Sequence, residues 1–284
     1  MLKMTECPRD AMQGLKDFIP TETKIKYINQ LLKVGFDTID FGSFVSPKAI
    51  PQMKDSADVL KGLDLDATNS KLLAIVANKR GAVDACQFDE IQYLGYPFSI
   101  SETFQQRNTN ASIEESLFRV EEISKLCTQH NKEIVVYISM AFGNPYGDPW
   151  NLEIAAHWCR KLSEDLGVKI LALSDTIGVS NHGNITTLFS GLIQELPKVE
   201  FGAHLHSTPD SVEEKVNAAY LAGCRRFDGA IKGFGGCPMA KDDLTGNMPT
   251  EQMIAYFDQN KIGTNLDKKA FEEATKMALN VFPI

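Results

Sequence analysis

The chain has 284 residues, of which 43% are hydrophobic, and this length is enough to bury one large core. Its formal net charge of −8 argues against a surface built for nucleic acid or for an anionic membrane. No apolar run approaches the roughly 20 residues that a bilayer span requires, so a membrane-spanning protein is not expected.

Short apolar runs alternate with longer amphipathic segments along the chain. Eight of the apolar runs have the length and composition of β-strands. They are Leu2–Glu6, Thr38–Phe41, Leu72–Val76, Glu90–Leu94, Ile134–Ile138, Ile170–Leu173, Val199–Leu205 and Arg226–Asp228. Helical periodicity is found in the segments Thr21–Val34, Ser112–Cys127, Trp150–Leu166, Ile185–Leu196 and Val212–Ala222. Ser112 and Glu115 have the spacing of a capping box at the start of one of these helices.

Eight strands, each followed by a helix or a helical loop, predict an α/β protein folded as a (β/α)8 TIM barrel. An open, doubly wound sheet is the alternative, but no glycine-rich dinucleotide fingerprint follows any of the strands. Beyond about Thr250 we predict a last helix and then a C-terminal helical appendage over Asp267–Val281. No linker or shift in composition marks a second domain, so a single domain over residues 1–284 is expected.

Active sites of such barrels lie at the C-terminal ends of the strands. The polar residues found at those ends are Arg9, Asp10, Asp40, Tyr137, Asp175, Thr176, His204 and His206. His204 and His206 are two residues apart on a predicted strand, so they point to one face. Barrel closure places the first strand beside the eighth and the eighth beside the seventh, which brings Asp10 near both histidines. A carboxylate and two imidazoles can hold a divalent metal ion, although a pair of satisfied polar residues is the plainer interpretation.

A glycine-rich segment with one cysteine follows the eighth strand, over residues 232–240. Its glycines predict a mobile loop whose backbone can approach a ligand closely. Cys237 in this loop is a candidate acid or base, and a small residue tolerated in a turn is the alternative. Asn247 offers an amide oxygen as a metal ligand, or else belongs to the start of the helix after Pro249.

Several motifs together resemble the 3-hydroxy-3-methylglutaryl-CoA lyases, within a larger family of metal-dependent barrel lyases and synthases. The motifs are ECPRDAMQ at 6–13, SFVSPK at 43–48, PQM at 51–53, SIEES at 112–116, SDTIG at 174–178, HLH at 204–206 and GGCPMA at 235–240. They run from the first predicted strand to the last, so the resemblance covers nearly the whole chain. The Gly-Gly-Cys-Pro sequence is the most specific motif, because it separates the lyases from citramalate- and isopropylmalate-type synthases.

The resemblance implies metal-dependent cleavage of 3-hydroxy-3-methylglutaryl-CoA to acetyl-CoA and acetoacetate, a reaction of leucine degradation. The metal ligands that it implies, for Mg2+ or Mn2+, are Asp10, His204, His206 and Asn247. The catalytic residues that it implies are Arg9, His204, Cys237, Asp175 and Asp40. The substrate-binding residues that it implies are Arg9, Gln13, Lys16 and Thr176. It also implies that Glu251 lies next to the metal ligands and supports them without binding the metal itself. Within this scheme Arg9 holds the thioester carbonyl, Cys237 is a mobile acid or base, and His204 shares the proton transfer.

Departures from the family pattern fall near the expected site. Asp40 stands where the family usually has the longer Glu, and Ser207 stands where the family has Asp after the His-x-His motif. Asn144 replaces a cysteine in the loop after the fifth strand, and the segment from Cys237 to Asn247 is one residue longer than usual. These departures bear on which acyl group the enzyme accepts.

Two other functions fit the same residues. One is a retro-aldol lyase for another 3-hydroxyacyl-CoA or for a 4-hydroxy-2-oxo acid, and the other is a non-enzymatic barrel that binds a ligand or partner. The six cysteines form no CxxC pair and no export signal is evident, so free thiols and a cytoplasmic location are expected. The expected partners are an acyl-CoA substrate and further copies of the chain, in a dimer or tetramer, with no nucleic acid and no membrane.

Overall fold

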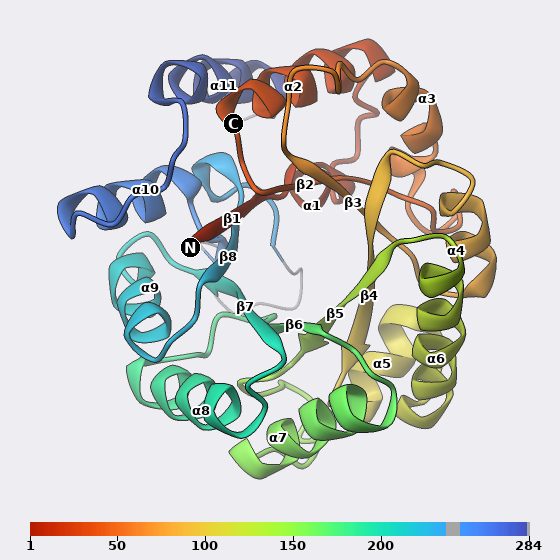
Figure 1. Cartoon of the computed structure of the whole chain (residues 1–284), viewed down its shortest axis with the longest axis vertical. Helices are drawn as coiled ribbons and strands as arrows, with labels where there is room; N and C mark the ends of the chain where they lie inside the picture. The colour runs from red at the N-terminus through yellow and green to blue at the C-terminus, as the bar shows by residue number, and fades with distance from the viewer. Residues whose placement is uncertain (237–244, 283–284) are drawn as a thin grey trace.

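A barrel of eight parallel strands is the centre of the computed structural model, which describes residues 1–236 and 245–282 (Figure 1). The strands are β1 (Lys3–Glu6), β2 (Thr38–Ser43), β3 (Lys71–Ile75), β4 (Ile91–Ser99), β5 (Glu133–Ser139), β6 (Ile170–Asp175), β7 (Glu200–Ser207) and β8 (Arg226–Gly229). They follow one another in chain order, β1 lies between β2 and β8, and the ring closes because β6 pairs with β7. The predicted TIM barrel is confirmed.

Helices surround the barrel on the outside, as Figure 1 shows. They are α2 (Thr21–Val34), α3 (Ser56–Lys61), α4 (Lys79–Ala85), α5 (Glu102–Thr109), α6 (Ile113–Gln129), α7 (Leu152–Arg160), α8 (His182–Glu195), α9 (Val212–Leu221), α10 (Thr250–Gln259) and α11 (Lys268–Val281). A short helix α1 (Pro8–Gln13) follows β1 directly, and single helical turns occupy Pro51–Met53, Lys161–Asp165 and Ile231–Gly233. The predicted capping box of α6 is present, with Ser112 and Glu115 each accepting from the other's backbone N–H.

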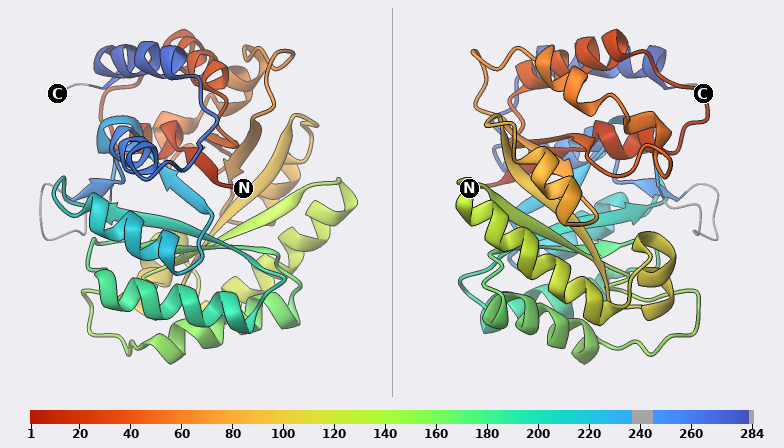
Figure 2. Two further views of the ribbon diagram at one scale, coloured as in Figure 1. Left: turned by 60° about the vertical axis from the view of Figure 1, so that its left-hand side comes forward. Right: turned by 90° about the vertical axis from the view of Figure 1, so that its right-hand side faces the viewer.

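The C-terminal helix α11 lies beside α2, and the views in Figure 2 agree on this. Gln30 Nε2 donates to the Ala270 carbonyl at 2.9 Å, and the rings of Tyr27 and Phe282 meet edge to face at 5.8 Å between centroids. The chain end therefore covers the outside of the barrel near β1 and β2, and the predicted C-terminal helical appendage is confirmed.

The interior of the barrel has an apolar part and a charged part. Leu73, Tyr93, Val135, Tyr137, Ile170 and Ala172, all from β3 to β6, form a small hydrophobic cluster separate from the main core. The strands on the other side, β7, β8 and β2, instead bury charged or ionisable side chains, namely Asp40, His206, Arg226 and Asp228. Burial of so many charges is costly unless they are paired or bind an ion, so this side is where function is expected.

Each helix in the described residues is too short or too polar to cross a membrane.

Candidate active site and metal centre

Three side chains that the sequence predicts as metal ligands meet at one end of the barrel. Asp10, His204 and His206 each offer a ligand atom, and these atoms lie within 4.8 Å of one another. Asp10 is on α1, whose first residue is Pro8, and this helix turns the chain across the barrel mouth directly after β1. His204 and His206 are alternate residues of β7 and share a face. Barrel closure therefore brings together residues that are almost 200 positions apart in the sequence.

Donors from three directions surround the carboxylate of Asp10. Arg9 Nη1 donates at 3.0 Å, Gln13 Nε2 at 2.6 Å and Asn247 Nδ2 at 2.9 Å. Burial raises the pKa of Asp10, but Arg9, the two histidines and Asn247 outweigh it, so the pKa lies below its usual range. The group is an anion at neutral pH, which is the form that a cation requires.

The two histidines have opposite electrostatic surroundings. Burial, with a further contribution from His204, lowers the pKa of His206 to about 4, so this imidazole is neutral near pH 7. Burial also lowers the pKa of His204, but Asp228 and Asp10 outweigh it and the pKa lies above the ordinary value. The cause is direct, because His204 Nδ1 lies 3.2 Å from Asp228 Oδ2. His206 has the properties of a metal ligand and His204 those of a ligand that can also hold a proton.

Asn247 is positioned by a short antiparallel strand, β9 (Gly246–Asn247), which pairs with the end of β7. Its Nδ2 donates both to Asp10 and to the carbonyl of Phe234, so the amide links Asp10 to the segment after β8. Gly235 lies against it with φ +87, and a Cβ at that position would be 2.8 Å from Asn247 Nδ2 and 2.9 Å from the Asp10 carbonyl. Only glycine fits this conformation at this distance.

Arg9 is held in place by Asp40 at the middle of β2. Arg9 Nε lies 3.1 Å and 3.0 Å from the two carboxylate oxygens of Asp40, and Nη2 contacts the same group. Burial raises the pKa of Asp40 to about 6 although Arg9 lowers it, so Asp40 is ionised at neutral pH. Two of the five guanidinium N–H groups stay free of these contacts with Asp40 and Asp10, and they can donate to a substrate oxygen.

The described residues fit a divalent cation. Two imidazole nitrogens, one carboxylate and a neighbouring amide form a donor set common for such ions. The buried Nδ1 of His206 has no hydrogen-bond partner among the described residues, which is unusual for a buried polar atom. The role of Asn247 as a ligand, rather than as the support of Asp10, stays a prediction.

Other predicted residues lie around this cluster in different settings. Asp175, at the end of β6, accepts from Val179 N, Ser180 N and Lys215 Nζ, each at 2.9 Å. Lys215 also donates to the His206 carbonyl at 2.7 Å, so Asp175 is tied to the backbone of β7. Thr176 Oγ1 accepts from Met140 N at 3.0 Å. Their catalytic and substrate-binding roles stay predictions.

Three further predicted residues follow. Lys16 is exposed in the segment after α1. Glu251 accepts from the backbone N–H of Lys232 at 2.9 Å, and Lys232 has φ +63, so Glu251 supports the chain just after β8. Cys237 lies outside the described residues, as do residues 238–244 of the segment that is one residue longer than usual.

Sequence reasoning missed two buried acids that the structure joins to the site. Asp228 contacts His204, and Glu6 accepts from Ile231 N at 2.8 Å and from Thr250 Oγ1 at 2.6 Å. The sequence signal for Asp228 is its place as the last residue of the predicted strand Arg226–Asp228; in the structure, Gly202 and Ala203 of β7 pair with Arg226 and Phe227 of β8. The next residues in that register are His204 and Asp228.

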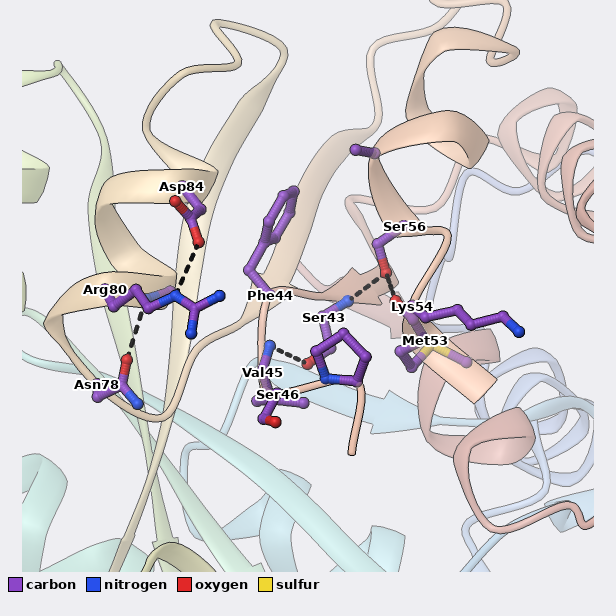
Figure 3. Close-up of a pocket in the computed structure, with 13 residues that line it drawn as sticks. Ser43, Phe44, Val45, Ser46, Met53, Lys54, Ser56, Asn78, Arg80 and Asp84 are labelled. Carbon is purple, nitrogen blue, oxygen red and sulfur yellow. Dashed lines mark hydrogen bonds and ion pairs between the residues drawn. The ribbon is translucent and has the colours of Figure 1, made fainter. Parts of the chain in front are cut away.

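The SFVSPK motif lines a cavity of about 190 Å3 between the end of β2 and helices α3 and α4 (Figure 3). Ser43 and Ser56 are hydrogen bonded on its wall, where Ser56 Oγ accepts from Ser43 N at 3.0 Å. Lys54 and Arg80 are among its lining residues, with Asp84 Oδ2 3.8 Å from Arg80 Nε. The SFVSPK motif therefore forms both the end of β2 and part of the wall of this cavity.

A closed (β/α)8 barrel with buried acids, histidines and an arginine at one end is the architecture of a barrel enzyme. Residues 4–278 match the family model described as HMGL-like. Pseudomonas aeruginosa 3-hydroxy-3-isohexenylglutaryl-CoA/hydroxy-methylglutaryl-CoA lyase is 33% identical over 268 residues, which are 94% of this chain and 88% of that protein. The chain belongs to the HMGL-like family, which confirms the predicted resemblance and the class of carbon–carbon lyase.

Solved structures agree with this assignment. The crystal structure of the Bacillus subtilis HMG-CoA lyase superposes with a TM-score of 0.90 at 33% identity, covering 97% of this chain and 91% of that one. An HMG-CoA lyase from Acinetobacter baumannii, in complex with coenzyme A and 3-methylmalate, has a TM-score of 0.90 at 29% identity. The match covers 99% of this chain and 91% of that chain.

Proposed function

We propose that this protein cleaves 3-hydroxy-3-methylglutaryl-CoA to acetyl-CoA and acetoacetate, using a divalent cation. The observation that carries the proposal is the meeting of Asp10, His204 and His206 beside the paired guanidinium of Arg9. Relatives of 33–34% identity named as hydroxymethylglutaryl-CoA lyases support the choice of substrate. The family resemblance favours Mg2+ or Mn2+, held by Asp10, His204, His206 and Asn247.

The bound cation would orient the substrate's oxygens and make its hydroxyl group more acidic. His204 takes the hydroxyl proton in the state in which its one lone pair is not donated to the cation, and Asp228 stabilises the protonated form. As the proton leaves, the bond between the carbinol carbon and the thioester α-carbon breaks, and acetoacetate is released. The electron pair of that bond moves to the thioester, which becomes an enolate.

Arg9 stabilises the enolate oxygen through the N–H groups that Asp40 and Asp10 leave free. Asp40 and Asp10 hold the guanidinium of Arg9 in one orientation. Because both carboxylates already contact Arg9, none of the three side chains has to move before the reaction. Cys237 then gives a proton to the enolate carbon, which completes acetyl-CoA. A thiol is a suitable donor here, because it is neutral until the proton is needed.

A wider acyl specificity is the second candidate function. The Pseudomonas aeruginosa relative is named for an isohexenylglutaryl thioester as well as for the methyl compound. Asp40 is one methylene shorter than the usual Glu, and Asn144 is also a departure close to the mouth. Cleavage of a longer 3-alkylglutaryl thioester would identify this wider specificity. Cleavage of a 4-hydroxy-2-oxo acid without CoA would exclude both the narrow and the wider acyl-CoA lyase activity.

A coupled assay tests the proposal. Purified protein is treated with EDTA, supplied with Mg2+ or Mn2+, and given the hydroxymethylglutaryl thioester, while acetoacetate is measured. We expect turnover that requires both the thioester and the cation. A single domain over residues 1–284, assembly into a dimer or tetramer, a cytoplasmic location and a role in leucine degradation are further proposals that rest on the family resemblance.

A further inference from the structure

We propose that Cys7, His204 and Asp228 form a second metal site, selective for Zn2+, beside the Asp10–His204–His206 cluster. This inner site goes beyond the proposed function, because it requires no substrate and serves no step of the cleavage. The three side chains each offer one ligand atom, and these atoms lie within 4.8 Å of one another. Binding there withdraws His204 from the outer cluster, so the site makes the protein sensitive to zinc.

Three neighbouring strands bring the inner ligands together. Cys7 follows β1 directly, and its backbone N–H donates to the Gly229 carbonyl at the end of β8 at 2.9 Å. Asp228 is on β8, which lies between β1 and β7 in the barrel, and His204 is on β7 (Figure 1). His204 and Asp228 are therefore held by strand pairing, and Cys7 lies one residue beyond a paired strand, which is a more rigid scaffold than a loop.

Two of the three ligands are buried without adequate partners. The Sγ of Cys7 is fully buried, and its hydrogen-bond contact is a long one of 4.0 Å to the Thr5 carbonyl. Asp228 is 2% exposed, and its Oδ1 has no partner among the described residues, while Oδ2 faces His204 Nδ1. A buried carboxylate oxygen without a donor requires an explanation, and a cation supplies one.

Cys7 also differs from the other described cysteines. Cys86, Cys127, Cys159 and Cys224 belong to the main hydrophobic core, where a thiol acts as a small apolar group. Cys7 is outside that cluster, and the charged groups that act on it are the carboxylates of Asp228, Asp40 and Asp10, opposed by the guanidinium of Arg9. Negative charge around the Cys7 thiol disfavours a bare thiolate. The same charge favours a dication that replaces the thiol proton.

The donor atoms point to zinc. One sulfur, one imidazole nitrogen and one carboxylate oxygen match the ligands that Zn2+ prefers, whereas Mg2+ and Mn2+ favour the sulfur-free outer cluster. As the zinc–sulfur bond forms, the thiol releases its proton to solvent, and a water molecule can complete a four-coordinate site. The outer and inner sites exclude one another, because a neutral imidazole has one lone pair and His204 belongs to both.

Cobalt substitution tests the inner site directly. Co2+ replaces Zn2+ and gives a near-ultraviolet thiolate-to-metal absorption only when sulfur is a ligand. EDTA-treated protein should develop this absorption with one equivalent of Co2+. Cys7→Ala should lose it and bind Zn2+ at least about ten-fold more weakly, with its Mn2+ affinity within about two-fold of the original.

Two matched variants separate the sites. His206→Ala removes a ligand of the outer cluster alone, so it should lose Mn2+ binding and keep the thiolate absorption. Cys237→Ala should keep both. The proposal is wrong if the absorption is absent from the original protein, or if it survives in Cys7→Ala; its loss in Cys237→Ala would assign the thiolate to Cys237 instead.

X-ray absorption at the zinc edge keeps the test independent of how the variants fold. In the original protein with one equivalent of Zn2+, the first shell should contain one sulfur at about 2.3 Å beside nitrogen and oxygen. A shell without sulfur would overturn the inner site. None of these readouts measures cleavage, so a negative result here leaves the proposed lyase activity unaffected. Likewise, a failure of the lyase assay leaves the zinc site unaffected.

Discussion

Arg9 determines the charge balance among the buried residues at the barrel mouth. Its guanidinium lies between Asp40 and Asp10, and the residue is only 7% exposed. Asp40 is shorter than the family's usual Glu, yet both of its oxygens reach Arg9 Nε. The replacement of Glu by Asp at this position therefore keeps the ion pair with Arg9. What it changes is the space beside the pair, because Asp is one methylene shorter.

Replacing Arg9 should affect the chemical step more than metal binding. We expect Arg9→Met to lower kcat by about 10²–10³-fold, since it removes a donor to the enolate oxygen. Mn2+ titration of the same variant should show a much smaller change, and Arg9→Lys should recover only part of the rate, because it lacks the planar fork. Equal loss of Mn2+ and of turnover would show that Arg9 acts as a structural partner of Asp40.

Cys237 is proposed to act in the transition state. Cys237→Ala should lower kcat by several orders of magnitude with little change in KM or metal content. Cys159→Ala, which alters a thiol of the hydrophobic core, serves as the control and should keep its turnover. Near-normal turnover in Cys237→Ala would remove the thiol from the mechanism and leave His204 to supply the proton.

At the level of single residues, the sequence predicts the metal-ligand cluster better than it predicts the side chains that contact the members of that cluster. Asp10, His204 and His206 follow from strand alternation and barrel closure, and the structure brings them together. The contact between Asp228 and His204 depends on the register between β7 and β8, which periodicity does not reveal. Glu6 is similar, because its partners lie in segments more than 200 residues away.

The segment after β8 depends on a glycine for its path past Asp10. Gly235→Ala should weaken Mn2+ binding, because its Cβ would meet Asn247 Nδ2 and the Asp10 carbonyl. Gly147→Ala is a matched control, since Gly147 has a similar φ of +79 but no atom beyond its two chain neighbours within 4 Å of the position that a Cβ would take. Calorimetric Mn2+ titration of both variants compares them, and equal effects would mean that backbone strain, rather than the clash, is responsible.

Glu6 joins β1 to the two segments that flank residues 232–249. Burial raises the pKa of Glu6 to about 8, although its bonds from Thr250 and Ile231 oppose the shift. The folded state therefore binds more protons than the unfolded state between about pH 4.5 and 8, and the free energy of unfolding falls as pH rises through this range. Its contribution is complete below pH 4.5 and lost above about pH 8.

Urea unfolding at several pH values tests this behaviour. In the original protein, Glu6 should reduce the free energy of unfolding by up to about 1.4 kcal/mol per pH unit between pH 5 and 8. Glu6→Gln has the same shape and no titrating group, so its pH dependence should be flatter by that amount. Parallel curves for the two proteins would show that Glu6 is ionised in the folded state.

At the level of elements, the strands are predicted well and the short helices are not. All eight strands fall where apolar runs predict them, although β4 continues to Ser99, well beyond the predicted Leu94. α2 matches its predicted range because a long amphipathic helix shows its period clearly. Helices α1, α3 and α4 have only six or seven residues, too few for a period to appear, and α1 carries Asp10.

For the molecule as a whole, barrel closure is the step that turns separate motifs into one site. Pairing of β1 with β8 and of β8 with β7 places α1 beside the histidines. The same pairing places Cys7 beside Asp228, so one closure creates both the outer cluster and the inner one. The family motifs predict the first of these, and only the structure reveals the second.

The most direct test of the account compares the original protein with His206→Ala in one experiment. Mn2+ binding and acetoacetate formation from the hydroxymethylglutaryl thioester are measured together, with circular dichroism as the control for folding. We predict stoichiometric Mn2+ and turnover in the original protein, and loss of both in a folded His206→Ala variant. A folded His206→Ala variant that retains Mn2+ and full turnover would contradict the placement of the catalytic cation at Asp10, His204 and His206.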